Sequence, residues 1–270
     1  MNGPAFPGAV TLADVQAQPD ERNLAIEAVG VSDVRYPLTL AGTGGRRIPT
    51  VATFAMTVAL PARVKGTHMS RFIEVLEELG PELRAAEDLV AMARRVRARL
   101  EASEAAIEMR FPYFVRKAAP VSGVASLLDC DVTWRAEARG GGERELAMAV
   151  ATPVTSLCPC SKEISDYGAH NQRSSVRIDV RLATAMRIEE LVAIAERAAS
   201  CEVYGLLKRP DEKYVTEKAY DNPKFVEDLV RDVALALARE PRVLAYTVEA
   251  ENFESIHNHS AFARIRSAAR

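Results

Sequence analysis

LAIEAVGVSDVRYPLTL (24–40) and IPTVATFAMTVAL (48–60) are the two segments that decide the fold of this chain. Both are rich in β-branched residues and partly alternate between apolar and polar positions, which is the pattern of half-buried strands. The segment between them, AGTGGRR, contains three glycines and predicts a turn. Together these segments predict a β-hairpin.

Outward from this hairpin, the first half of the chain continues with two helices and two strands. Helical spacing of apolar residues is found at 69–78 and 83–102, and strand composition at 106–120 and 123–139. The second half repeats the order of paired strands, two helices and paired strands, at 145–157, 175–184, 187–200, 222–240, 242–253 and 260–267. In the last helix, Asn222 is the predicted N-cap and Pro223 suits the first helical position.

Each half therefore predicts a β-β-α-α-β-β unit, and the fold class is α+β, with antiparallel sheets and helices on one face. A mixed α/β wrapping is less favoured, because the strands come in adjacent pairs and do not alternate with helices. The predicted organisation is a mobile N-terminal arm at 1–23, a first unit at 24–139 and a second unit at 140–270.

Charge and cysteine content exclude several classes of function. The 270 residues hold 35 Lys+Arg and 37 Asp+Glu, a net charge of −2, so no global basic field attracts nucleic acid or an anionic membrane. No apolar stretch is long enough for a membrane span, and the N-terminus lacks the features of a signal peptide, which predicts a cytoplasmic protein. Four cysteines in such a chain indicate metal binding or catalysis and not a disulfide scaffold.

PVTSLCPCSKEISDYGAHNQRS (153–174) is the segment richest in chemically active side chains. If this stretch is extended, Cys158 and Cys160 point to opposite faces, so one thiolate ligand is favoured over a bidentate pair. The alternative is two buried structural cysteines and a core histidine at His170. Clustering of these residues with charged groups favours the functional interpretation.

Further candidate groups lie downstream. Glu212 stands in a turn-like stretch, Glu227 near the start of a helix, and Glu254, His257 and His259 in one short segment. A thiolate, an imidazole and a carboxylate suit a divalent ion such as Zn²⁺, with one position left for water. The alternatives are a solvated turn charge at Glu212, a charge favoured by the helix dipole at Glu227, and a hydrogen-bonding residue at the start of a strand at His259.

Upstream, VKGTHMSRF (64–72) places Lys65, His68 and Arg71 at the start of the first predicted helix. A helix N-terminus with nearby Lys and Arg can bind an anion, and a triphosphate would fit. An ordinary helix start with exposed basic side chains is the alternative. The chain contains no P-loop, dinucleotide-binding, nucleophile-elbow or zincin motif.

Taken together, PVTSLCPCSKEISDYGAHNQRS, VKGTHMSRF, LKRPDEKYVTEKAYDNPKFVEDLVRD and ENFESIHNHSAFA closely resemble the prokaryotic type IB GTP cyclohydrolase I family, from about residue 20 to 265. The resemblance implies a tandem tunnelling fold, with the metal site in the second unit, and a homotetramer. It also implies conversion of GTP and water into 7,8-dihydroneopterin triphosphate and formate, the first step of folate-type pterin biosynthesis.

The same resemblance implies roles for individual residues. Cys158, Glu212 and His257 match the metal ligands, for an ion that could be Zn, Mn or Fe, and His170 matches a proton-transferring residue or a further ligand. Glu227 matches the residue that anchors the purine, while Cys160 and Glu254 match positions that line the pocket. Two alternatives stay open: a related tunnelling-fold nitrile reductase with a cysteine nucleophile, and a non-catalytic assembly protein structured by zinc.

Overall fold

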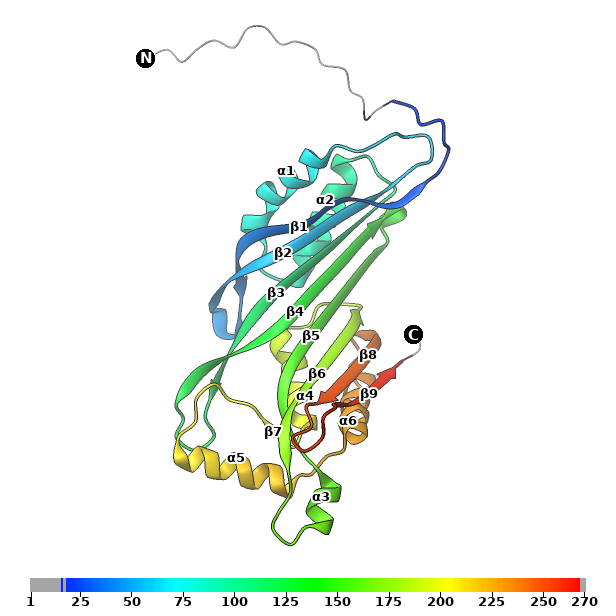
Figure 1. Cartoon of the computed structure of the whole chain (residues 1–270). Coiled ribbons are helices and arrows are strands. Elements are labelled where there is room, and N and C mark those ends of the chain that lie inside the picture. Colours follow the sequence, from blue (N-terminus) through cyan, green and yellow to red (C-terminus); the bar gives the residue numbers. More distant parts are fainter. Residues whose placement is uncertain (1–15, 17, 268–270) are drawn as a thin grey trace, which may run out of the picture.

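The computed structural model describes residues 16 and 18–267. Its centre is one antiparallel sheet that runs through both halves of the chain (Figure 1). The strands are β1 (Ile26–Ala41), β2 (Arg47–Leu60), β3 (Glu104–Ala118), β4 (Ala125–Arg139), β5 (Arg144–Leu157), β6 (Asn171–Leu182), β7 (Cys201–Glu202), β8 (Val243–Asn252) and β9 (Ala261–Arg266).

Each strand pairs with its neighbours in the order β1-β2-β3-β4-β5-β6-β8-β9, with the short β7 beside β5. All of these pairs are antiparallel. The predicted α+β class with an antiparallel sheet is therefore confirmed. The predicted boundary at 139/140 falls between β4 and β5, which pair directly from Asp131↔Ala151 to Ala138↔Arg144.

Four of the helices cover one face of the sheet, as predicted (Figure 1). The helices are α1 (Met69–Leu79), α2 (Ala86–Arg99), α3 (Pro159–Ile164), α4 (Ile188–Ala198), α5 (Arg209–Asp221) and α6 (Val226–Ala238), with short 3-10 turns at η1 (Thr43–Gly45), η2 (Gly80–Glu82) and η3 (Gly140–Gly142). Whereas α1, α2, α4 and α6 pack on the sheet, α3 and α5 lie at one end of it. Among the described helices, none combines the length and the apolar character needed to cross a membrane.

Apolar residues at every second position of 48–60 place one face of β2 in the core. Every second side chain of this strand, from Ile48 to Leu60, is buried, and the positions between them are more exposed. The fully buried Phe54 and Met56 belong to the same hydrophobic cluster as Leu89 of α2. Burial of a side chain of this size contributes about 1.5–3 kcal/mol, so this face holds the helices on the sheet.

The structure corrects two local predictions. The stretch that contains Glu212 is not a turn but the first part of α5, and Asn222 is not the N-cap of the following helix. Instead Asn222 ends α5, and its side-chain amide donates to the carbonyl oxygen of Ala199 at 2.9 Å. The next helix, α6, starts after Phe225, whose amide is capped by the Asp228 carboxylate at 3.2 Å.

Asp211 explains why α5 forms despite its weak apolar pattern. Its carboxylate accepts from the amide of Lys208 at 2.8 Å, which caps the helix start. The same carboxylate accepts from the amides of Val121 and Ser122 at 2.8 Å and from the Ser122 hydroxyl at 2.6 Å, in the turn between β3 and β4. Burial alone would raise the pKa of Asp211, but these hydrogen bonds more than offset it and hold the pKa well below its usual value.

Most of the predicted N-terminal arm (1–23) lies outside the described residues. Its last part pairs with the segment after β2: the amide of Lys65 donates to the carbonyl oxygen of Gln18 at 3.2 Å, and that of Asp20 to Arg63 at 3.0 Å. Pro19 and Val64 form the β-bridge between these two bonds. The arm is thus tied to the segment that carries Lys65.

Candidate active site

Cys158 and His170 meet where β5 ends and β6 begins. The last residue pair of these strands is Leu157↔Asn171, and the amide of Cys158 donates to the carbonyl oxygen of His170 at 3.2 Å. The chain is not extended at the two cysteines, because it turns into α3 after Cys158, so the thiols do not alternate across a strand. Cys158 is half-buried and caps α3, its Sγ accepting from the Ser161 amide at 3.5 Å, while Cys160 is exposed within the helix.

Three side chains surround the imidazole of His170. Its Nδ1 lies 2.9 Å from Oε1 of Gln172, 3.5 Å from the hydroxyl of Ser255 and 3.9 Å from a carboxylate oxygen of Glu254. The His170 and Glu254 side chains are each only 12% exposed. An amide oxygen only accepts, so this contact fits the tautomer with the hydrogen on Nδ1, which leaves Nε2 to accept a proton or bind a metal.

The loop between β8 and β9 brings Glu254 to this place. Asn252, at the end of β8, is buried and bonds to the hydroxyl of Ser156 at 3.2 Å, and the amide of Phe253 donates to the carbonyl oxygen of Arg173 at 3.1 Å. The ends of β5 and β8 therefore lie beside the start of β6, which brings together the predicted residues Cys158, His170 and Glu254. Gln172 was not predicted; its position two residues after His170, where the chain enters β6, was the available signal.

The predicted metal ligands do not all converge within one chain. His257 lies exposed on the β8–β9 loop, its ring stacked on that of His259 at 5.1 Å between centroids. Glu212 is exposed in the first turn of α5, the end that Asp211 ties to the β3–β4 turn. Within the described part of the chain, no three His, Cys, Asp or Glu side chains form a group that could hold a metal ion. The donor chemistry of Cys158, His257 and Glu212 suits a divalent ion, but one chain alone does not bring the three together.

Glu227 lies in the first turn of α6 and is exposed. This position agrees with a charge favoured by the helix dipole and leaves the carboxylate accessible to a ligand. The structure is thus compatible with Glu227 either as a charge favoured by the helix dipole or as a ligand-binding carboxylate.

The predicted triphosphate-binding residues lie at the opposite end of the strands from Cys158 and His170. The segment that follows the end of β2 carries Lys65, His68 and Arg71. Because the strands are antiparallel, the end of β2 lies at the same end of the sheet as the starts of β3, β5 and β8. Cys158 and Glu254, in contrast, follow the ends of β5 and β8. Figure 1 shows α1 and α3 at opposite ends of the molecule. Lys65 donates to the side chain of Gln18 at 3.3 Å and Arg71 to the carbonyl oxygen of Arg99 at 3.4 Å.

The two other cysteines fit the structural interpretation. Cys130 and Cys201 are buried, and burial raises the pKa of the first to about 12 and of the second to about 11. Both therefore stay protonated near neutral pH, unlike a thiolate ligand. Cys158 and Cys160 are the accessible thiols of the chain.

Comparison with known proteins agrees with the sequence motifs. Residues 12–263 match the family model described as Type I GTP cyclohydrolase folE2. GTP cyclohydrolase FolE2 1 of Dechloromonas aromatica is 59% identical over 96% of this chain and 97% of its own length. GTP cyclohydrolase FolE2 of Paraburkholderia xenovorans is 58% identical over 95% of both chains.

Among solved structures, uricase from Arthrobacter globiformis superposes with a TM-score of 0.51, covering 97% of this chain and 96% of its own, at 10% sequence identity. This likeness shows the fold alone, which is that of the tunnelling-fold proteins. The family description agrees with the predicted type I GTP cyclohydrolase. The chain belongs to the type I GTP cyclohydrolase FolE2 family.

Proposed function

We propose that this chain is a GTP cyclohydrolase I that converts GTP and water into 7,8-dihydroneopterin triphosphate and formate, and that it is of the prokaryotic type IB. The observation that carries this proposal is the match to the family over residues 12–263. The convergence of Cys158, His170 and Glu254 at one end of the strands supports it. The tandem arrangement of two β-β-α-α-β-β units and a cytoplasmic location belong to the same proposal.

The chemistry requires opening of the guanine ring at C8 and several proton transfers. His170 is suited to these transfers, because Gln172 fixes Nδ1 as a donor and leaves Nε2 free to exchange a proton. Glu254, at 3.9 Å, would stabilise the imidazolium that forms. Glu227 would accept from N1–H and the exocyclic amine of guanine, a pair of donors that adenine lacks.

The proposed metal is a divalent ion, Zn, Mn or Fe, held by Cys158, Glu212 and His257. When bound, such an ion lowers the pKa of a coordinated water and so supplies the nucleophile. Because one chain does not bring these ligands together, the proposed site is completed by neighbouring subunits. The proposed assembly is a homotetramer, and the open strand edges of β1 and β9 provide surfaces for association.

The direct test is incubation of the purified, metal-reconstituted full chain with GTP, followed by quantification of formate and of the pterin fluorescence of the oxidised product. The proposal predicts equal amounts of both. Formation of a product without formate would instead favour another tunnelling-fold reaction. Absence of turnover in a correctly assembled, metal-loaded protein would contradict the proposal.

A further inference from the structure

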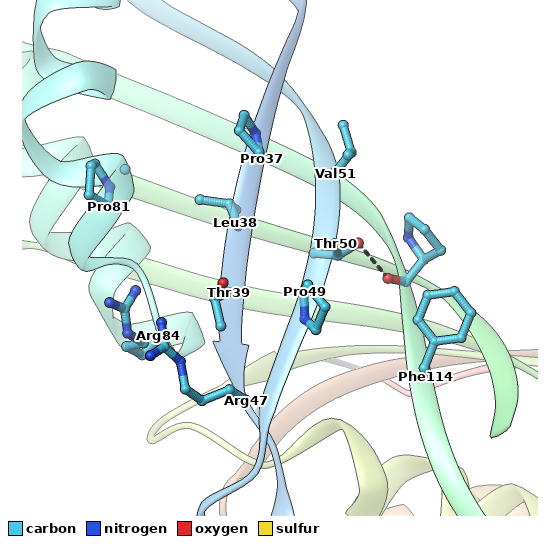
Figure 2. A pocket seen from close by; sticks show the side chains of 12 residues that line it. Pro37, Leu38, Thr39, Arg47, Pro49, Thr50, Val51, Pro81, Arg84 and Phe114 are labelled. Atoms are coloured by element: carbon cyan, nitrogen blue, oxygen red, sulfur yellow. Dashed lines mark hydrogen bonds between the residues drawn. The ribbon is translucent and has the colours of Figure 1, made fainter. Parts of the chain in front are cut away.

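A cleft opens on the first half of the molecule where β2 separates from β3. The two strands pair only from Val58↔Ala105 to Thr53↔Arg110, whereas β2 stays paired with β1 as far as Ala41↔Arg47. Beyond this point the Thr50 hydroxyl holds the strands through a bond to the carbonyl oxygen of Pro112 at 2.8 Å. The resulting cavity, called here the arginine cleft, measures about 640 Å³ and is lined by Thr39, Arg47, Pro49, Thr50, Arg84 and Phe114 among others (Figure 2).

The charged side chains that line this cleft and the one adjoining it at Arg47 are all arginines. Arg47 and Arg84 are the charged residues that line the arginine cleft, and an adjoining cleft of about 370 Å³ shares Arg47 and adds Arg46 and Arg116. No aspartate or glutamate lines either cleft. Within the described part of the chain none of the four arginines forms an ion pair, although the chain as a whole carries a net charge of −2.

Neighbouring arginines behave differently. Two exposed arginines of α2 pair with glutamates of α1: Arg95 with Glu78 and Arg99 with Glu74, both at 2.7 Å. Figure 2 shows Arg47 extending from β2 toward Arg84, which stands just before α2. Two guanidinium groups that line one cleft without a carboxylate repel each other, and a bound anion removes this repulsion.

The backbone at Arg84 is held firmly in place. The Asp88 carboxylate accepts from the amides of Arg84 and Ala85, both at 2.8 Å. The preceding turn η2 packs closely on β1, where a Cβ at Gly80 would come within 2.7 Å of the Tyr36 ring, so a side chain is excluded there. One guanidinium nitrogen of Arg84 donates to the carbonyl oxygen of Leu83 at 2.8 Å, which leaves its other donors for a ligand.

We propose that the arginine cleft binds a phosphate group between Arg47 and Arg84. Arginine forks match phosphate oxygens in pairs, and here they stand beside an apolar wall that includes Pro49 and Phe114. This wall can accept the organic part of a phosphate ester such as a nucleotide. The ligand is therefore either free phosphate or a nucleoside phosphate, and the site is separate from Cys158 and His170.

The experiment uses the assembled full chain and three probes: inorganic phosphate, adenosine monophosphate and adenosine. An adenine nucleotide is chosen because the proposed guanine anchor Glu227 does not select it, so the result does not depend on the proposed function. Binding is measured by calorimetry and by the fluorescence of Trp134. This residue is the single tryptophan of the chain, and it lines a neighbouring cleft that also contains Arg84.

The phosphate-bearing probes are expected to bind saturably and adenosine is not. Arg84→Gln and Arg47→Gln should each weaken phosphate binding by about tenfold or more, because each removes charge-assisted hydrogen bonds. Arg94→Gln is the matched control, since this exposed arginine of α2 lines neither cleft. Far-ultraviolet circular dichroism and size-exclusion chromatography check that each variant is folded and assembled.

The two phosphate-bearing probes also identify the source of the ligand. Tighter binding of the monophosphate, lost in Phe114→Ala, identifies a nucleotide; equal binding of both identifies free phosphate. Absence of saturable binding, or affinities that are the same in wild type and in Arg84→Gln, would overturn the proposal. Loss of binding in Arg94→Gln to the same extent would also overturn it, because the effect would then be one of general charge.

Discussion

His170 is the residue whose surroundings restrict the chemistry most. Nδ1 lies 2.9 Å from the side-chain oxygen of Gln172 and 3.9 Å from the Glu254 carboxylate, so in the proposed reaction the proton is exchanged at Nε2. The neighbouring Cys158 is held by a backbone bond to the same histidine. Cys158, His170 and Glu254 thus lie where β5 and β8 end and β6 begins.

Replacement of His170 by alanine should lower the rate of formate release by about 10²–10⁴-fold, which is the usual contribution of a general acid or base. The chain should stay folded, because the backbone bond to Cys158 does not depend on the imidazole. Arg94→Gln is the control, as this exposed residue of α2 belongs to none of the proposed sites for GTP or metal. Full activity of His170→Ala would show that the proton is moved by another group.

Glu227→Gln should weaken GTP binding by about ten- to a hundredfold, because donors of the guanine base lose their acceptor. The metal content should stay the same, since Glu227 is not among the proposed ligands. Affinity is measured by competition with a GTP analogue, and metal by atomic absorption. An unchanged affinity would leave Glu227 as a charge that interacts with the dipole of α6.

At the level of elements, α5 connects the two halves of the molecule. Its start is joined to the β3–β4 turn by Asp211, and its end is followed by the loop that leads to α6. Lys218 of this helix pairs with Glu202 of β7 at 2.6 Å, beside the end of β5. The helix therefore sets the position of Glu212 relative to the sheet.

Asp211→Asn should lower the urea midpoint of unfolding at pH 7, because four hydrogen bonds to the carboxylate are weakened or lost. The pKa of Asp211 is lowered in the folded chain, so the stability it contributes is present above the unfolded pKa of about 3.9 and is lost as the pH falls through the folded value. The difference between wild type and variant should thus shrink in strongly acid solution. A difference that stays constant down to the lowest pH at which the chain folds would contradict this account.

The elements that could be predicted from the sequence are those with a strong apolar period. In 48–60 every second residue faces the helices, and in 226–238 buried residues recur at helical spacing, so both were found. The helix α5 was missed because only Asp211 and Ala219 are buried in it, and its start depends on a turn about ninety residues away. Cys158, His170 and Glu254 were predicted, whereas the bond from Gln172 depends on how β6 begins.

At the scale of the whole molecule, the proposed site residues fall into two groups. Cys158, His170 and Glu254 lie at one end of the strands, and Lys65 and Arg71 lie at the other. A strand of 14 residues such as β2 spans roughly 45 Å at 3.3 Å per residue, which is longer than a nucleotide. One GTP molecule therefore cannot contact both groups of the same chain, so in the proposed assembly two chains form each site.

Removal of divalent metal by chelation should abolish formate release, and added metal should restore it, because water activation is lost without the ion. Cys158→Ala should lose metal and activity together while the far-ultraviolet circular dichroism stays the same. Cys160→Ala, which removes the exposed thiol of α3, is the matched comparison and should keep the metal. Full turnover by thoroughly metal-free protein would contradict the metal-dependent reaction.

The most direct measurement is a subunit-mixing experiment with two inactive variants, Cys158→Ala and the double variant Lys65→Ala/Arg71→Ala. The two chains carry different tags and are expressed together, so that mixed assemblies can be purified. Each proposed site combines the end of the sheet that carries Cys158 in one chain with the end that carries Arg71 in another. In a random mixture each of these two contributions is intact with a probability of about one half, so about a quarter of the sites are restored. Mixing of Cys158→Ala with Glu254→Gln, which alter the same end, is the control and should restore none. Formate release at about a quarter of the wild-type rate is the predicted result, and mixed assemblies no more active than either variant alone would contradict a site shared between chains.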